Sequence, residues 1–187
     1  MFLSRFFKAL GIICIVLAVF LLWQRNNPKR LMFSSFFPTK VETLPLKNSQ
    51  PIRLIIRNSN IDLPIIPAKI SGRRWETTTQ GVSWLTLSSL PGEQGNGIIY
   101  GHNWTNILGN LLYVKTGYEI EIVYKDGTKK NFIVDHTALV SPKDVSVLNQ
   151  SKDKRITLYT CAGILDEKRF VVSARLKQDF SKSIKDL

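Results

Sequence analysis

RITLYTCAGILDEKRFVVSARL, residues 155–176, is the most informative stretch of the chain. Apolar and polar side chains alternate at 155–161 and again at 169–176, on either side of a short connection. A period of two residues is typical of β-strands, whereas a helix would show a period near 3.6. The stretch therefore predicts a β-hairpin whose strands are joined by residues 162–168.

The same alternation sorts the side chains of this hairpin onto two faces. If Ile156 and Leu158 face the core, Cys161 faces the other way. If Val172 faces the core, Arg169 does not. Cys161 and Arg169 then share the non-core face, at the strand ends that flank the connection. A guanidinium beside an exposed thiol favours the thiolate, so we expect Cys161 to be an accessible nucleophile.

Both residues also have plainer interpretations. An isolated cysteine is often a small residue packed beneath a sheet, and an arginine at a strand end often forms a solvated ion pair, here with Asp166 or Glu167. Arg175 is a second candidate cation, but it lies in mid-strand, farther from the thiol. Because Cys161 and Arg169 fall on one face, the functional interpretation is favoured.

A general acid or base must come from one of two histidines, His102 and His136. His102 follows a short apolar strand at 98–101 that ends in glycine, so its imidazole is expected at a strand-to-loop junction, where sites are commonly assembled. His136 lies between Asp135 and Thr137 at the end of a predicted strand and is expected to form a local hydrogen bond. His102 is the predicted proton-transfer residue.

The chain from Pro51 onward is predicted to be one all-β domain. Apolar runs at 52–57 and 61–66 are separated by polar residues, and runs at 118–124 and 129–135 alternate across an Asp-Gly turn. Long helical periodicity is absent from this part of the sequence. Seven or eight short strands predict a closed barrel or a sandwich.

The N-terminal residues predict a membrane anchor at 6–24, preceded by a short tail at 1–5. The run carries one charge, Lys8, close to its end, and it is long enough to span a bilayer. A cleaved signal peptide is the alternative. However, the run ends in an interfacial Trp23 followed by Arg25, and no A-x-A-like cleavage site follows it. The flanking charges balance, so the orientation does not follow from them.

Residues 25–50 contain three prolines among mixed residues and are predicted to be a linker to a catalytic domain at 51–187. Within the linker, the clusters Leu31-Met32-Phe33 and Phe36-Phe37 could pack on the membrane surface or cap the domain, and the sequence does not choose between the two.

Charge and cysteine content exclude several classes of protein. The formal net charge of +12 favours anionic surroundings, but no zinc-finger spacing, basic helix or RNP-like aromatic run accompanies it, so nucleic acid is not an expected partner. Of the two cysteines, Cys14 lies within the apolar run, and there is no C-x-x-C. A disulfide scaffold and a zinc site are therefore excluded, and neither a metal nor a cofactor is expected.

Three motifs occur in a set order along the chain: Gly-His-Asn-Trp at 101–104, Thr-Leu-Tyr-Thr-Cys at 157–161 and Arg-Phe-Val-Val-Ser-Ala at 169–174. Together, and after an N-terminal anchor, they resemble the signature of the sortases, which are membrane-anchored cysteine transpeptidases. The resemblance covers roughly residues 51–176 and implies an eight-stranded β-barrel.

The resemblance also implies roles for individual residues. Cys161 would attack the threonyl carbonyl of an L-P-x-T-G-like signal on a surface protein and form a thioester. His102 would protonate the departing glycine amine and then deprotonate an incoming amine, from a wall precursor or a pilin lysine. Arg169 would stabilise the oxyanion, and Thr160 would line the substrate groove. The domain would lie outside the cytoplasm.

Some sortases bind calcium through clustered acids before the catalytic histidine strand, whereas residues 90–96 offer only Glu93, so no metal is expected. The connections after His102 and between Cys161 and Arg169 are short, so a large accessory lid is not expected, and they resemble those of the compact housekeeping-type or class D/E/F-like enzymes more than those of class B. A papain-like hydrolase is disfavoured because His102 precedes Cys161. A non-catalytic anchored β-domain that binds wall polymer or a protein partner is the remaining alternative.

Overall fold

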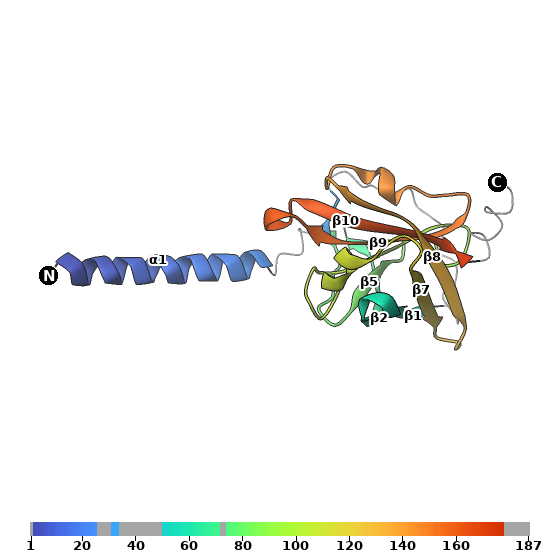
Figure 1. Cartoon of the computed structure of the whole chain (residues 1–187), viewed down its shortest axis with the longest axis horizontal. Helices are drawn as coiled ribbons and strands as arrows, with labels where there is room; N and C mark the ends of the chain where they lie inside the picture. The colour runs from blue at the N-terminus through green and yellow to red at the C-terminus, as the bar shows by residue number, and fades with distance from the viewer. Residues whose placement is uncertain (1, 26–30, 34–49, 72–73, 178–187) are drawn as a thin grey trace.

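The structure is a computed structural model that describes residues 2–25, 31–33, 50–71 and 74–177. Eight strands close into a barrel in the order β1-β2-β5-β6-β9-β10-β8-β7 (Figure 1). These strands are β1 (Pro51–Ile56), β2 (Ile61–Ala68), β5 (Val82–Leu85), β6 (Gly95–Tyr100), β7 (Glu119–Tyr124), β8 (Lys129–Val140), β9 (Lys154–Ala162) and β10 (Lys168–Leu176). The predicted closed eight-stranded barrel is confirmed.

Smaller elements connect the barrel strands. A separate two-stranded ribbon pairs β3 (Ile70–Ser71) with β4 (Arg74–Trp75). The 3₁₀ turns are η2 (Arg57–Ser59), η3 (Gly109–Tyr113), η4 (Val145–Leu148) and η5 (Ile164–Asp166). The Asp144 carboxylate caps η4 by accepting a hydrogen bond from the Ser146 amide at 3.2 Å.

The hairpin predicted from alternation is present as β9 and β10, which pair in antiparallel register from Lys168 opposite Ala162 to Arg175 opposite Arg155. The β7–β8 hairpin is also present. Strand β8 runs on to Val140, beyond the predicted end, because its second half pairs with β10. The barrel is mixed, since β2 pairs with β5 and β6 with β9 in parallel.

The barrel interior is filled by apolar side chains from all eight strands. On β9 these are Ile156 and Leu158, and on β10 they are Val172 and Ala174. The alternation of inward and outward side chains in this hairpin is therefore as predicted. Burying such side chains is the dominant stabilising contribution, at about 1.5–3 kcal/mol for each large one.

A second apolar cluster covers the outside of β6, β9 and β10, and we call it the outer cluster. Its buried members are Leu31, Phe33, Ala68, Trp75, Leu85, Ile98, Tyr100, Leu148, Tyr159, Cys161 and Val171. This part of the barrel wall is therefore packed on both faces. Of the linker clusters, Leu31-Met32-Phe33 packs on the barrel, whereas Phe36-Phe37 lies outside the described residues.

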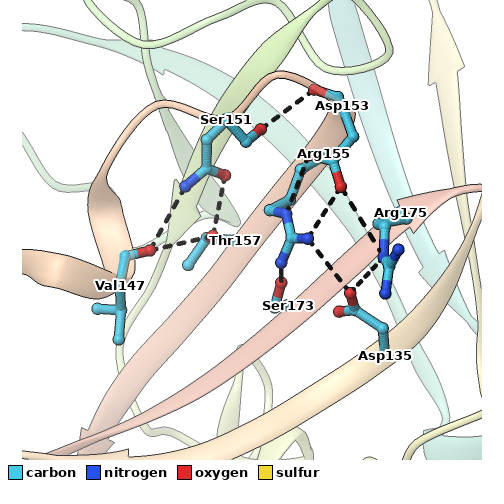
Figure 2. A network of polar contacts seen from close by, with 9 residues as sticks. Asp135, Val147, Ser151, Asp153, Arg155, Thr157, Ser173 and Arg175 are labelled. Atoms are coloured by element: carbon cyan, nitrogen blue, oxygen red, sulfur yellow. Dashed lines mark hydrogen bonds and ion pairs between the residues drawn. The ribbon is translucent and has the colours of Figure 1, made fainter.

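A polar network fastens β8, β9 and β10 at the opposite end of the hairpin from Cys161 (Figure 2). Asp135 on β8 forms ion pairs with Arg175 on β10 at 2.6 Å and with Arg155 on β9 at 3.4 Å. Arg155 also pairs with Asp153 at 2.9 Å. The network fixes the register of the hairpin without taking part in the candidate site.

Helix α1 (Phe2–Arg25) stands apart from the barrel (Figure 1). Its stretch Arg5–Gln24 is long and apolar enough to cross a membrane, and none of it is buried against the rest of the protein. A helix exposed on every side yet apolar needs a lipid or protein surface to cover it.

Candidate active site

The β9–β10 hairpin brings Cys161 and Arg169 together. The two residues are directly opposite each other in the antiparallel register. Both lie on the outer face of the barrel wall, because Tyr159 and Val171, two positions away on each strand, belong to the outer cluster. The pair lies at the strand ends next to the connection between β9 and β10, so the Cys161 thiol is located at a strand end.

The parallel pairing of β6 with β9 brings His102 to the same end of the barrel. Tyr100 is in register with Tyr159, and the two rings stack at 5.5 Å and 15°. The Gly101 amide continues this pairing by donating to the Tyr159 carbonyl at 3.3 Å. His102 is two residues after Tyr100, and Cys161 is two residues after Tyr159. Both residues therefore lie at the ends of neighbouring strands.

Thr160 has a contact that sequence analysis did not foresee. Its side chain is fully buried, and its hydroxyl donates to the Gly101 carbonyl at 2.8 Å. Alternation places it on the opposite face of β9 from Cys161. In this position Thr160 connects the end of β9 to the residue before His102.

His102 is 7% exposed and stacks on Trp104, with 4.5 Å between ring centroids and an interplanar angle of 14°. Burial lowers the pKa of its imidazole below the usual value, and the nearby charge of Asp166 acts in the opposite direction. The ring is therefore mostly neutral near pH 7 and can accept a proton.

Arg169 is 3% exposed and is held by backbone carbonyls. Its Nη1 donates to the carbonyls of Asp166 and Lys168, each at 2.9 Å, and its Nη2 donates to the Met32 carbonyl at 3.0 Å. Its buried Nε has no hydrogen-bond partner among the described residues. A guanidinium held this way presents donors suited to a peptide carbonyl or an oxyanion.

The expectation that Cys161 is exposed is wrong. The residue is 3% exposed and belongs to the outer cluster, although it is not inside the barrel. Alternation predicted its face correctly, but that face is covered by other segments, including Leu31 and Phe33. The thiol of the free protein is thus less accessible than its position at a strand end suggested.

The loop between β9 and β10 follows Cys161 immediately and is conformationally unusual. Gly163 has φ 82°, and Leu165 and Asp166 have φ 57° and 60°. Left-handed backbone costs about 1 kcal/mol or more for non-glycine residues, so two in succession mark a constrained turn. Ile164 and Leu165 are exposed at its tip, while the Asp166 carbonyl holds Arg169.

The alternative candidates, His136 and Arg175, do not lie at this site. His136 is exposed on β8, opposite Ser173 of β10, and Arg175 belongs to the remote polar network. Within the described ranges, no group of three or more histidine, cysteine or acidic side chains is arranged to hold a metal ion.

Sequence reasoning assigned no role to Trp104 or Tyr159 and considered Asp166 only as an ion-pair partner of Arg169. It left Leu31–Phe33 on either the membrane surface or the domain. Trp104 and Tyr159 lie within the quoted motifs, each two residues from a catalytic candidate. This spacing could have indicated that both aromatic side chains belong to the site. Nothing in the sequence pattern of 31–33 indicates which surface it covers.

Comparison with known proteins gives one consistent result. The Sortase domain family model matches residues 54–177, whereas no curated protein matches the chain. A lid mutant of sortase A from Corynebacterium diphtheriae is 27% identical, with a TM-score of 0.59 over 70% of this chain and 71% of its own. Streptococcus agalactiae sortase C1 in complex with MTSET is 25% identical, with a TM-score of 0.59 over 67% of this chain and 66% of its own.

A third solved structure, a Clostridium perfringens sortase D5 transpeptidase, is 25% identical, with a TM-score of 0.57 over 71% of this chain and 82% of its own. The family match spans the barrel strands and includes the three residues gathered at the candidate site. This chain is a member of the sortase family.

Proposed function

We propose that this protein is a cysteine transpeptidase that cleaves an L-P-x-T-G-like sorting signal and transfers its acyl part to an amine. The observation that carries the proposal is the direct pairing of Cys161 with Arg169, beside the strand end that leads to His102. A thiol, an imidazole and a guanidinium at one edge of the barrel wall suit acyl transfer. Membership of a family of cysteine transpeptidases supports this assignment.

In the first half-reaction, His102 takes the proton of the Cys161 thiol as the sulfur attacks the threonyl carbonyl. Its lowered pKa leaves the imidazole neutral and able to do so. Arg169 donates hydrogen bonds to the developing oxyanion. The peptide C–N bond then breaks, the glycine amine leaves with the proton held by His102, and a thioester remains on Cys161.

In the second half-reaction, an amine attacks the thioester carbonyl and gives up a proton to His102. Arg169 again faces the oxyanion. The new amide forms as the C–S bond breaks, and the departing thiolate recovers the proton from the imidazole. No oxidant or metal is needed, because each step exchanges one acyl bond for another.

The substrates proposed for this site are a surface protein with the sorting signal and an amine on a wall precursor or a pilin lysine. Helix α1 would anchor the enzyme in the membrane, with the barrel outside the cytoplasm. An apolar helix with no described residue buried supports the anchoring. The location of the barrel outside the cytoplasm follows from the proposed surface-protein substrate.

The test uses the purified full chain in detergent with a small library of L-P-x-T-G-like peptides and glycine or lysine amines, read by mass spectrometry. We expect an acyl-enzyme adduct on Cys161 and a ligated product that depends on the amine. The matched control is Cys161→Ala, which should yield neither. A folded wild-type protein that gives no adduct with any peptide would overturn the proposal, and free acid as the sole product would make it a hydrolase.

A further inference from the structure

Trp104 lies two residues after His102, and its indole ring is stacked on the imidazole. The two ring centroids are 4.5 Å apart, and the ring planes are inclined by 14°. Because His102 is only 7% exposed, the indole replaces solvent on one face of the imidazole. A cation within about 6 Å of an indole centroid is attracted to the negative face of that ring. The stack therefore has its largest effect when the imidazole carries an additional proton.

The turn from His102 to Gly109 fixes the position of the indole. The Trp104 carbonyl accepts hydrogen bonds from the amides of Ile107 at 2.9 Å and Gly109 at 2.8 Å. The His102 carbonyl accepts a hydrogen bond from the Leu108 amide at 3.1 Å. A Cβ atom on Gly109 would lie 2.8 Å from the Trp104 carbonyl oxygen, so this close turn requires glycine. Both residues of the stack are thus anchored through their own carbonyls to one short turn.

The barrel supports the same indole from within. Trp104 is partly buried and packs against the apolar interior cluster. A side chain that is fixed by both its backbone and its packing offers a rigid surface to a neighbouring ring. The indole therefore limits rotation of the His102 imidazole about its own side-chain bonds.

The surroundings of His102 make its protonated form costly. Burial is the larger effect on its pKa and lowers it, and the charge of Asp166 acts in the opposite direction. In the proposed reaction the proton of the Cys161 thiol moves to the imidazole, which leaves a thiolate and an imidazolium. The negative face of the Trp104 indole stabilises that imidazolium on a side where water is excluded.

We propose that Trp104 is a positioning residue for His102 and that its indole face stabilises the imidazolium formed during acyl transfer. The part played in acyl transfer rests on the proposed function, whereas the effect on protonated His102 does not. The other titratable side chains at this end of the barrel are Cys161 on β9, Asp166 on η5 and Arg169 on β10, and η3 carries no charged side chain. The experiments leave all of these unchanged.

The first experiment replaces tryptophan by 5-fluorotryptophan throughout the full chain, in detergent. Fluorine withdraws electron density from the indole face with little change in its size, so the burial of His102 is retained. We expect the pKa of His102, measured by NMR titration of its imidazole, to fall by at least about 0.2 unit. In Trp104→Phe, in which the remaining tryptophans are still fluorinated, the same labelling should leave the pKa of His102 unchanged.

The second experiment compares Trp104→Phe with Trp104→Leu. Both variants have a smaller side chain, but only phenylalanine keeps an aromatic face for the imidazole. Where a sorting peptide is turned over, kcat should fall about threefold in Trp104→Phe and about tenfold in Trp104→Leu, with KM within about twofold in both. Trp84→Phe, a change in the barrel interior, is the matched control and should alter kcat by less than about twofold.

A pKa of His102 that does not fall on fluorination, or that falls equally in Trp104→Phe, would overturn the proposal. Equal values of kcat in Trp104→Phe and Trp104→Leu would also overturn it, because the aromatic face would then have no effect on the reaction. If Trp104→Leu does not fold, the fluorination experiment decides alone. A folded chain that shows the expected fall in pKa but turns over no peptide would support the action of Trp104 on His102 and count against the transpeptidase assignment alone.

Discussion

At His102, burial and a nearby carboxylate act in opposite directions on one proton. Burial, the larger effect, lowers the pKa, and Asp166 raises it. Because the folded pKa lies below the unfolded value of about 6.5, the unfolded chain binds more protons as the pH falls. The neutral imidazole therefore contributes stability above about pH 6.5 that is lost as the pH falls through the folded pKa.

Removing the carboxylate should leave burial unopposed. We expect Asp166→Asn to lower the pKa of His102 further, while the Asp166 carbonyl that holds Arg169 is retained. An NMR titration of the imidazole measures this, with the resonance identified by its loss in His102→Gln. A pKa that stays unchanged in Asp166→Asn would show that the charge of Asp166 does not reach the ring.

Arg169 combines charge with a fixed fork of donors, and a lysine keeps only the charge. We expect Arg169→Lys to lower kcat/KM for acyl transfer by about 100-fold, the effect typical of losing an oxyanion donor. Arg175→Lys is the matched control on the same strand, remote from the thiol, and should stay within about twofold of wild type. Full activity in Arg169→Lys would assign the residue a role in packing.

The residues of the candidate site lie at strand ends, and Thr160 connects the end of β9 to the end of β6. Its buried hydroxyl is the side-chain donor to the Gly101 carbonyl. We expect Thr160→Val to lower the free energy of unfolding by about 1–3 kcal/mol, because that carbonyl loses a buried partner.

Activity of Thr160→Val should fall as well, since Gly101 leads directly to His102. Thr160→Ser keeps the hydroxyl and should recover most of the activity, and thermal unfolding with peptide turnover measures both effects. If valine were as active and as stable as threonine, the contact between β9 and β6 would not position the histidine.

How far the sequence predicts these elements depends on the range of the interactions. The two-residue period of β9 and β10 is local, so it correctly placed Cys161 and Arg169 on one face. The pairing of β6 with β9 joins distant segments, so local periodicity could not predict it. Exposure was mispredicted because the outer cluster to which Cys161 belongs is completed by residues distant in sequence, such as Leu31 and Phe33.

At the scale of the whole molecule, a barrel and an apolar helix have different solvent requirements. We expect α1 to insert into lipid, which would bury Cys14 near the centre of its membrane-spanning stretch. In liposomes, a charged maleimide should leave Cys14 unmodified, whereas in a Cys161→Ala background dissolved in denaturant it should react fully. Rapid modification of Cys14 in intact liposomes would mean that the helix lies outside the bilayer.

The position of Leu31 in the chain limits the distance between the end of helix α1 and the barrel. With Leu31 packed on the barrel, the stretch from Arg25 to Leu31 can extend to at most roughly 20 Å. If α1 spans a membrane, the barrel edge that carries Cys161 and Arg169 is therefore held near the surface of that membrane.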